Sequence, residues 1–190
     1  MRDVVLLLIG LAGMASVAVP APQGAQPTAQ VAPFSPRFEL QTLDGHHVTD
    51  ATYRGRWLLV YFGYTFCPDV CPTVLIDVGH ALNAIGPLAD RIQPIFITVD
   101  PVRDTASQMG QYLSAFSPRI VGLRGDPKQT EIVSKQFHTY YRARSLGNGA
   151  YAVDHSSFLY VISPDGRVAK VLPDSLRDQK LAEELRRLVQ

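Results

Sequence analysis

Apolar and polar positions along the chain predict strands that alternate with helices. Residues 38–43 alternate between the two classes and then meet Asp44-Gly45, which is typical of a strand entering a hairpin turn. Residues 57–63 and 92–99 are instead continuous apolar runs, as expected for central strands buried on both faces. From Pro72 onward, apolar residues recur at helical spacing until Gly86 and Pro87 end the predicted helix.

The rest of the chain continues this alternation. Helices are predicted at about 104–116, 127–141 and 175–189, and short strands at 121–123, 158–162 and 168–172. The order predicts an α/β fold, a three-layer sandwich with a central mixed sheet. A strand, a cysteine pair and a helix near the start, with a hairpin and a helix at the end, favour a thioredoxin-like domain.

The first 36 residues differ from this pattern. Val4–Val19 is an apolar run of about 16 residues, short for a membrane span and slightly long for a signal peptide core. Residues 1–19 are therefore expected to be a signal peptide or an N-terminal membrane anchor, and both readings place the globular part outside the cytoplasm. The Pro-rich residues 20–36 are expected to form a linker, which leaves 37–190 as the folded domain.

Composition excludes some classes of function. Lys and Arg total 18 against 17 for Asp and Glu, so no basic footprint for nucleic acid is present. The chain has only two cysteines, too few for a disulfide framework in a protein of this length. Its stability must come from an apolar core.

The two cysteines, Cys67 and Cys71, lie between the predicted strand 57–63 and the following helix. Pro72 suits the first helical position, which would put Cys71 near the N-cap, where the helix dipole stabilises a thiolate. A thiolate is both a nucleophile and a metal ligand, and an inert pair or a plain disulfide is also open. Two soft thiolates suit Cu(I), with zinc as the nearest competitor, and such a site needs a third donor.

Five histidines are candidates for that donor. His155 precedes the strand at 158, in a segment that faces the cysteine loop in thioredoxin-like folds, and neutral imidazole is a good copper ligand. Asp154 is expected to support the site without binding the metal, through its charge or by holding the loop. The other four are expected to be loop or helix residues away from the site: His46, His47, His80 and His138.

Several motifs together resemble the Sco/SenC family over about residues 34–190. They are Tyr64-Thr-Phe-Cys67-Pro-Asp-Val-Cys71-Pro72, Val99-Asp-Pro-Val-Arg-Asp104, Asp154-His155-Ser156 and Ser163-Pro-Asp-Gly166. The resemblance implies a membrane-tethered thioredoxin-like domain that binds one copper ion, Cu(I) or Cu(II), through Cys67, Cys71 and His155. It also implies a role in assembling the copper A centre of cytochrome c oxidase.

Three functions compete within this interpretation. The first is a copper chaperone whose partners are the copper A subunit and another periplasmic copper carrier. The second is a thiol-disulfide oxidoreductase that keeps the copper A cysteines reduced, with Cys67 and Cys71 as its redox-active pair. The third, a peroxidase-like enzyme, is disfavoured because such enzymes place a lone cysteine after the strand. We expect the first of these, in a bacterial periplasm.

Overall fold

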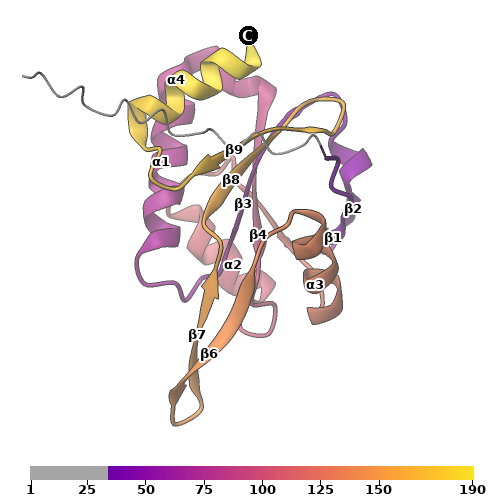
Figure 1. The fold of residues 1–190 in the computed structure, drawn as a ribbon, viewed down its shortest axis with the longest axis vertical. Coiled ribbons are helices and arrows are strands. Elements are labelled where there is room, and N and C mark those ends of the chain that lie inside the picture. The colour runs from indigo at the N-terminus through magenta and orange to yellow at the C-terminus, as the bar shows by residue number, and fades with distance from the viewer. Residues whose placement is uncertain (1–33) are drawn as a thin grey trace, which may run out of the picture. The chain divides into compact units, whose positions relative to one another are not determined.

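In the computed structural model, residues 34–190 are described, so the predicted leader 1–19 and most of the linker 20–36 lie outside them. A seven-stranded mixed sheet forms the centre, in the order β2-β1-β5-β4-β3-β8-β9 (Figure 1). Its strands are β1 (Glu39–Thr42), β2 (His47–Thr49), β3 (Trp57–Gly63), β4 (Ile92–Thr98), β5 (Val121–Arg124), β8 (Phe158–Ile162) and β9 (Val168–Pro173). The mixed α/β fold predicted from the sequence is confirmed.

Four α-helices and two short 3-10 helices lie in the described part of the chain. They are α1 (Val70–Ile85), α2 (Ala106–Ser114), α3 (Pro127–Gln136), α4 (Asp178–Val189), η1 (Asp50–Tyr53) and η2 (Gly86–Arg91). Among residues 34–190, no helix has both the length and the apolar character that a membrane crossing requires.

Both faces of the central strand β3 are buried, so each face of the sheet must be covered by other elements. The strand β3 pairs in parallel with β4 and antiparallel with β8, and residues 58–63 are all buried although neighbouring side chains point to opposite faces. On one face Tyr61 lies near Phe96, which meets Tyr112 of α2. On the other, Phe62 packs 5.0 Å from Phe137, which follows α3.

A second, two-stranded sheet was not predicted from the sequence. It consists of β6 (Tyr141–Gly147) and β7 (Ala150–His155), a hairpin that projects from the edge of the domain in Figure 1. The predicted helix 127–141 was therefore too long: α3 ends at Gln136, and His138 has a left-handed φ of 53° that no helix continues through. The segment before β8, predicted to be a loop, is the end of strand β7.

Candidate metal centre

Cys67 lies in the loop between β3 and α1, and Cys71 lies in the first turn of α1. The N-cap of α1 is Asp69, so the prediction that Cys71 is near the N-cap was wrong by two positions. The consequence for the thiolates is similar. The backbone N–H of Cys71 lies in the first turn, where it has no partner within the helix, and it donates to Cys67 Sγ at 3.4 Å. Cys67 is half-buried, whereas Cys71 is fully buried.

His155 brings the third donor from a distant part of the chain. Its Nε2 lies 3.4 Å from Cys71 Sγ, although 84 positions separate the two residues. Its Nδ1 is 3.0 Å from the carbonyl oxygen of Ser156, an acceptor to which it can only donate. That bond leaves Nε2 as the ring nitrogen that faces the sulfurs and that a metal ion beside them would bind.

The three donor atoms form one cluster. Cys67 Sγ, Cys71 Sγ and a ring nitrogen of His155 all lie within 4.8 Å of one another. Two sulfurs and one imidazole nitrogen at that spacing fit a soft ion held by three ligands, and this donor set suits Cu(I) better than the hard cations. Among residues 34–190, no other group of three such side chains meets the same spacing.

The two thiols differ strongly in acidity. The pKa of Cys67 is lowered by hydrogen bonding from the Cys71 thiol, and further by His155 and by backbone N–H groups of the helix start. The pKa of Cys71 is raised by its hydrogen bond to Cys67 and by burial. In the metal-free protein Cys67 is therefore the more acidic of the two thiols, and Cys71 keeps its proton to higher pH.

Two other features hold the cysteine loop in place. The carboxylate of Asp104 accepts hydrogen bonds from the backbone N–H and the hydroxyl of Thr65, and from the hydroxyl of Thr98. Asp104 is fully buried, and burial raises its pKa. In the sequence, residues 99–104 indicate only a family resemblance, and the contact of Asp104 with Thr65 was not predicted, although an Asp shortly after a buried strand was an available signal.

The remaining predicted residues lie where they cannot ligate with the cysteines. Asp154 is exposed on the opposite face of β7 from His155 and pairs with Arg144 across the hairpin at 3.0 Å. Asp154 was predicted to support the site either through its charge or by holding its segment. Its contact with Arg144 fits the second role. His80 lies 3.3 Å from Asp178, and His46 lies 3.4 Å from Asp44, both exposed.

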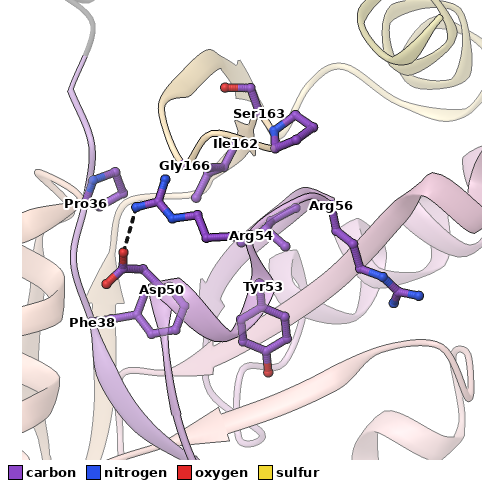
Figure 2. A pocket seen from close by; sticks show the side chains of 11 residues that line it. Pro36, Phe38, Asp50, Tyr53, Arg54, Arg56, Ile162, Ser163 and Gly166 are labelled. Carbon is purple, nitrogen blue, oxygen red and sulfur yellow. Dashed lines mark hydrogen bonds and ion pairs between the residues drawn. The ribbon is translucent and has the colours of Figure 1, made fainter.

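A hollow elsewhere on the domain is not a ligand site. It is lined by Pro36, Phe38, Tyr53 and Arg54 among others, and in Figure 2 Arg54 reaches across it to Asp50 at 2.9 Å. Its free volume of about 10 Å³ is at the lower limit for a single water molecule. The metal-ligating cluster is therefore the stronger candidate for function.

Comparison with known proteins supports the same region. A SCO1/SenC family model matches residues 26–190. The human protein SCO1 homolog, mitochondrial, is 38% identical over 152 residues, which cover 78% of this chain and 50% of that protein. The SCO1 homolog 1, mitochondrial, of Arabidopsis thaliana is 37% identical over 145 residues, 76% of this chain and 43% of that protein. The chain thus spans about half the length of these curated relatives.

Solved structures agree on the fold. The structure of Bradyrhizobium japonicum ScoI with copper bound matches with a TM-score of 0.75 and 38% identity, over 81% of this chain and 98% of that chain. The structure of Arabidopsis thaliana ScoI with copper bound matches with a TM-score of 0.76 and 33% identity, over 81% of this chain and 96% of that chain. Both carry copper on a domain of this thioredoxin-like architecture.

Proposed function

This chain belongs to the SCO1/SenC family, and from that premise we propose that it binds one copper ion through Cys67, Cys71 and His155. We further propose that it delivers this copper to the copper A site of cytochrome c oxidase. The observation that carries the proposal is the cluster of three soft donor atoms from two segments far apart in the sequence. Two related proteins of known structure are described with copper bound.

The burial of the three ligands suggests how copper would leave. Cys71 is fully buried, whereas Cys67 and His155 are partly exposed. An incoming thiolate can reach the ion only from the side of Cys67 and His155, so transfer would proceed by ligand exchange there, with Cys71 released last. This order is consistent with a carrier whose three ligands leave one side of the ion open.

The test is metal stoichiometry on the purified chain, reduced and anaerobic. Wild type should retain about one copper per chain after excess metal is removed, and Cys67→Ser, Cys71→Ser and His155→Ala should each lose it. The exposed His46→Ala variant is the matched control for His155→Ala and should retain copper. Copper that is retained after His155→Ala would refute the ligand assignment.

The second candidate is a thiol-disulfide oxidoreductase acting on the cysteines of the copper A site. The lowered pKa of Cys67 favours it, because a thiolate attacks disulfides and Cys71 lies beside it to complete the exchange. Since His155 also lowers the pKa of Cys67, His155→Ala should slow this exchange as well as weaken copper binding. Loss of His155 alone therefore does not separate the two functions.

A purified copper A domain separates them directly. Offered reduced and metal-free, it should take copper from the loaded chain if this protein is a chaperone. Offered as a disulfide, it should be reduced by the metal-free chain if this protein is a reductase, with two thiols oxidised for each disulfide cleaved. Copper transfer without disulfide reduction would establish the chaperone, and the reverse result would establish the reductase.

We place the protein in a bacterial periplasm, with residues 1–19 as signal peptide or membrane anchor, 20–36 as linker and 37–190 as the copper-binding domain. Fractionation of expressing cells would test this, because an anchored chain stays with the membrane after a high-salt wash and a cleaved one does not. A cytoplasmic product would contradict the proposal.

A further inference from the structure

His155 does not lie in a strand of the main sheet. His155 ends β7, and β7 pairs only with β6 in a separate two-stranded sheet. The two cysteines, in contrast, follow directly from the central strand β3. Because no strand pairing joins the two ligand-bearing segments until β8 begins at Phe158, side-chain contacts contribute to the separation of the imidazole and the sulfurs.

Arg103 makes such contacts with both segments. Its guanidinium carbon lies 3.7 Å from the ring centroid of Tyr151 in β7, and its Nη1 donates to the Tyr151 carbonyl oxygen at 2.8 Å. The same group lies 4.9 Å from the ring of Phe66, the residue before Cys67, and 5.6 Å from the ring of Tyr64. Arg103 therefore stands between the cysteine loop and the strand that carries His155.

Asp100 contacts both Arg103 and Tyr151. One of its oxygens accepts from Arg103 Nε at 2.5 Å, and the other accepts from the Tyr151 hydroxyl at 2.9 Å. Arg103 is only 23% exposed, so its charge is compensated by this carboxylate and by the aromatic faces rather than by water. Neither function argued above assigns a role to Arg103, Asp100 or Tyr151.

Arginine suits this position for a geometric reason. Its planar guanidinium can stack on Tyr151 while its N–H groups donate in the plane to the Tyr151 carbonyl and to Asp100. A lysine at the same place would keep the charge but lose the stacking and one of the two directed bonds. The contact thus fixes an orientation of β7 as well as a distance.

We propose that Arg103 is a positioning residue. Through its contacts with Tyr151, and with Asp100 as its counter-charge, it holds the His155 ring close enough to Cys71 for both to bind the same metal ion. This inference rests on the proposed copper site and adds to it the element that assembles the site from two segments. Tyr151 and His155 lie on the same strand, four residues apart, so a shift of β7 at Tyr151 moves the imidazole with it.

The test is a double-mutant cycle on Cu(I) affinity, measured by competition with a chromogenic chelator. Arg103→Met should weaken binding by roughly 10-fold to 100-fold, the usual effect of removing a residue that orients a metal ligand. In a His155→Ala background, where the weak residual Cu(I) binding by the two cysteines is measured against a weaker chelator, the same change should cost nothing further, because there is no imidazole left to position. Arg103→Lys should fall between wild type and Arg103→Met.

Two further variants keep the test decisive if Arg103→Met folds poorly. Tyr151→Phe removes only the hydroxyl bond to Asp100 and should weaken Cu(I) binding in the same direction by a smaller factor. Arg119→Met removes an arginine with similar contacts, to Asp90 and the Ala89 carbonyl, near the opposite end of the sheet. It should leave Cu(I) affinity unchanged.

A measurement on the metal-free protein separates a loss of His155 positioning from a general loss of stability. In the metal-free protein, the ¹⁵N shifts of the His155 ring should report one fixed tautomer in wild type and in Arg119→Met, and an averaged one in Arg103→Met. Equal losses of affinity with and without His155, or unchanged affinity in Arg103→Met, would overturn the inference. If wild-type affinity itself does not depend on His155, the proposed copper site has failed instead.

Discussion

The sulfur of Cys71 occupies space that exists only because residue 63 is glycine. A Cβ atom on Gly63 would lie 3.0 Å from Cys71 Sγ and 2.9 Å from Cε2 of the Phe96 ring. Gly63 is the last residue of β3, so the central strand comes within contact distance of the buried metal ligand. A side chain at this position must push either the ring or the sulfur away.

Gly63→Ala is therefore expected to disturb both stability and copper binding. Overpacking of this kind costs about 1–3 kcal/mol of unfolding free energy, and displacement of the sulfur should lower Cu(I) affinity. Urea unfolding and chelator competition measure the two effects. The control is Gly79→Ala in α1, where the nearest atom, the Phe116 carbonyl oxygen, would lie at an ordinary 3.5 Å. Unchanged copper affinity in Gly63→Ala would contradict the close contact.

Cys67 should react as a thiolate at a pH where an ordinary cysteine does not. Its folded-state pKa is lowered, so the thiolate forms as the pH rises through that lowered value and is complete well below the usual thiol range of about 8.5. In the reduced, metal-free protein, iodoacetamide should modify Cys67 at a rate that changes little between about pH 6 and 8.5. Cys71, whose pKa is raised, should stay unmodified until the protein unfolds.

Cys71→Ser provides the comparison for this pH profile. Because the Cys71 thiol is the largest cause of the lowered pKa, its loss should shift the rise in Cys67 reactivity to higher pH. Mass spectrometry of the alkylated peptides identifies which thiol has reacted. Faster alkylation of Cys71 than of Cys67 in the wild type would reverse the assignment of the thiolate.

Local pattern predicted the central strands well and the hairpin β6–β7 not at all. The continuous apolar run gave β3 its bounds because seven residues are too few for a buried helix and match the length of a strand buried on both faces. All but the first residue of β6 are exposed, so β6 has no hydrophobic periodicity, and only its pairing with β7 makes it a strand. Because β6 has no pattern of its own, nothing in the sequence marked the end of the helix predicted over 127–141 before β6 begins.

The site divides in a similar way. Residue type and spacing selected Cys67 and Cys71, whereas His155 was selected by its place before the strand at 158 and by the family resemblance. The structure brings the three together, while their binding of copper stays a prediction. Contacts such as Thr65 with Asp104, or Arg103 with Tyr151, join segments that are about 40 to 50 positions apart. No local pattern encodes these contacts, because they depend on how the turn after β4 packs against the cysteine loop.

The hydrogen bonds of Asp104 predict a ranking of two substitutions. Asp104→Ala leaves the Thr65 N–H and hydroxyl without an acceptor and should cost about 1–3 kcal/mol. Asp104→Asn keeps an oxygen for Thr65 and should cost less. Urea unfolding at neutral pH gives both values. Equal losses in the two variants would mean that the anchoring of Thr65 contributes little.

The raised pKa of Asp104 adds a pH dependence with a defined sign. The folded state binds a proton more tightly at Asp104 than the unfolded state does, so this group lowers stability as the pH rises from the unfolded value, near 3.8, through the raised folded value. The cost is complete once the pH lies above the raised pKa of Asp104 in the folded state. Asp104→Asn should remove the contribution, so the difference in stability between wild type and Asp104→Asn should change across this window. A constant difference from pH 4 to 7 would contradict it.

Oxidation of the cysteine pair should release copper. Diamide takes two electrons from the two cysteine sulfurs and two protons from the solvent as the sulfurs form a disulfide, which removes both thiolate ligands and leaves only His155. The loaded wild-type chain should lose its copper on oxidation and recover one ion per chain after reduction and reloading, followed by metal analysis. Since Cys67 and Cys71 are the chain's only cysteines, Cys71→Ser should show no oxidant-dependent change in any copper that it retains. Full retention of copper by the oxidised wild type would show that the cysteines are not its ligands.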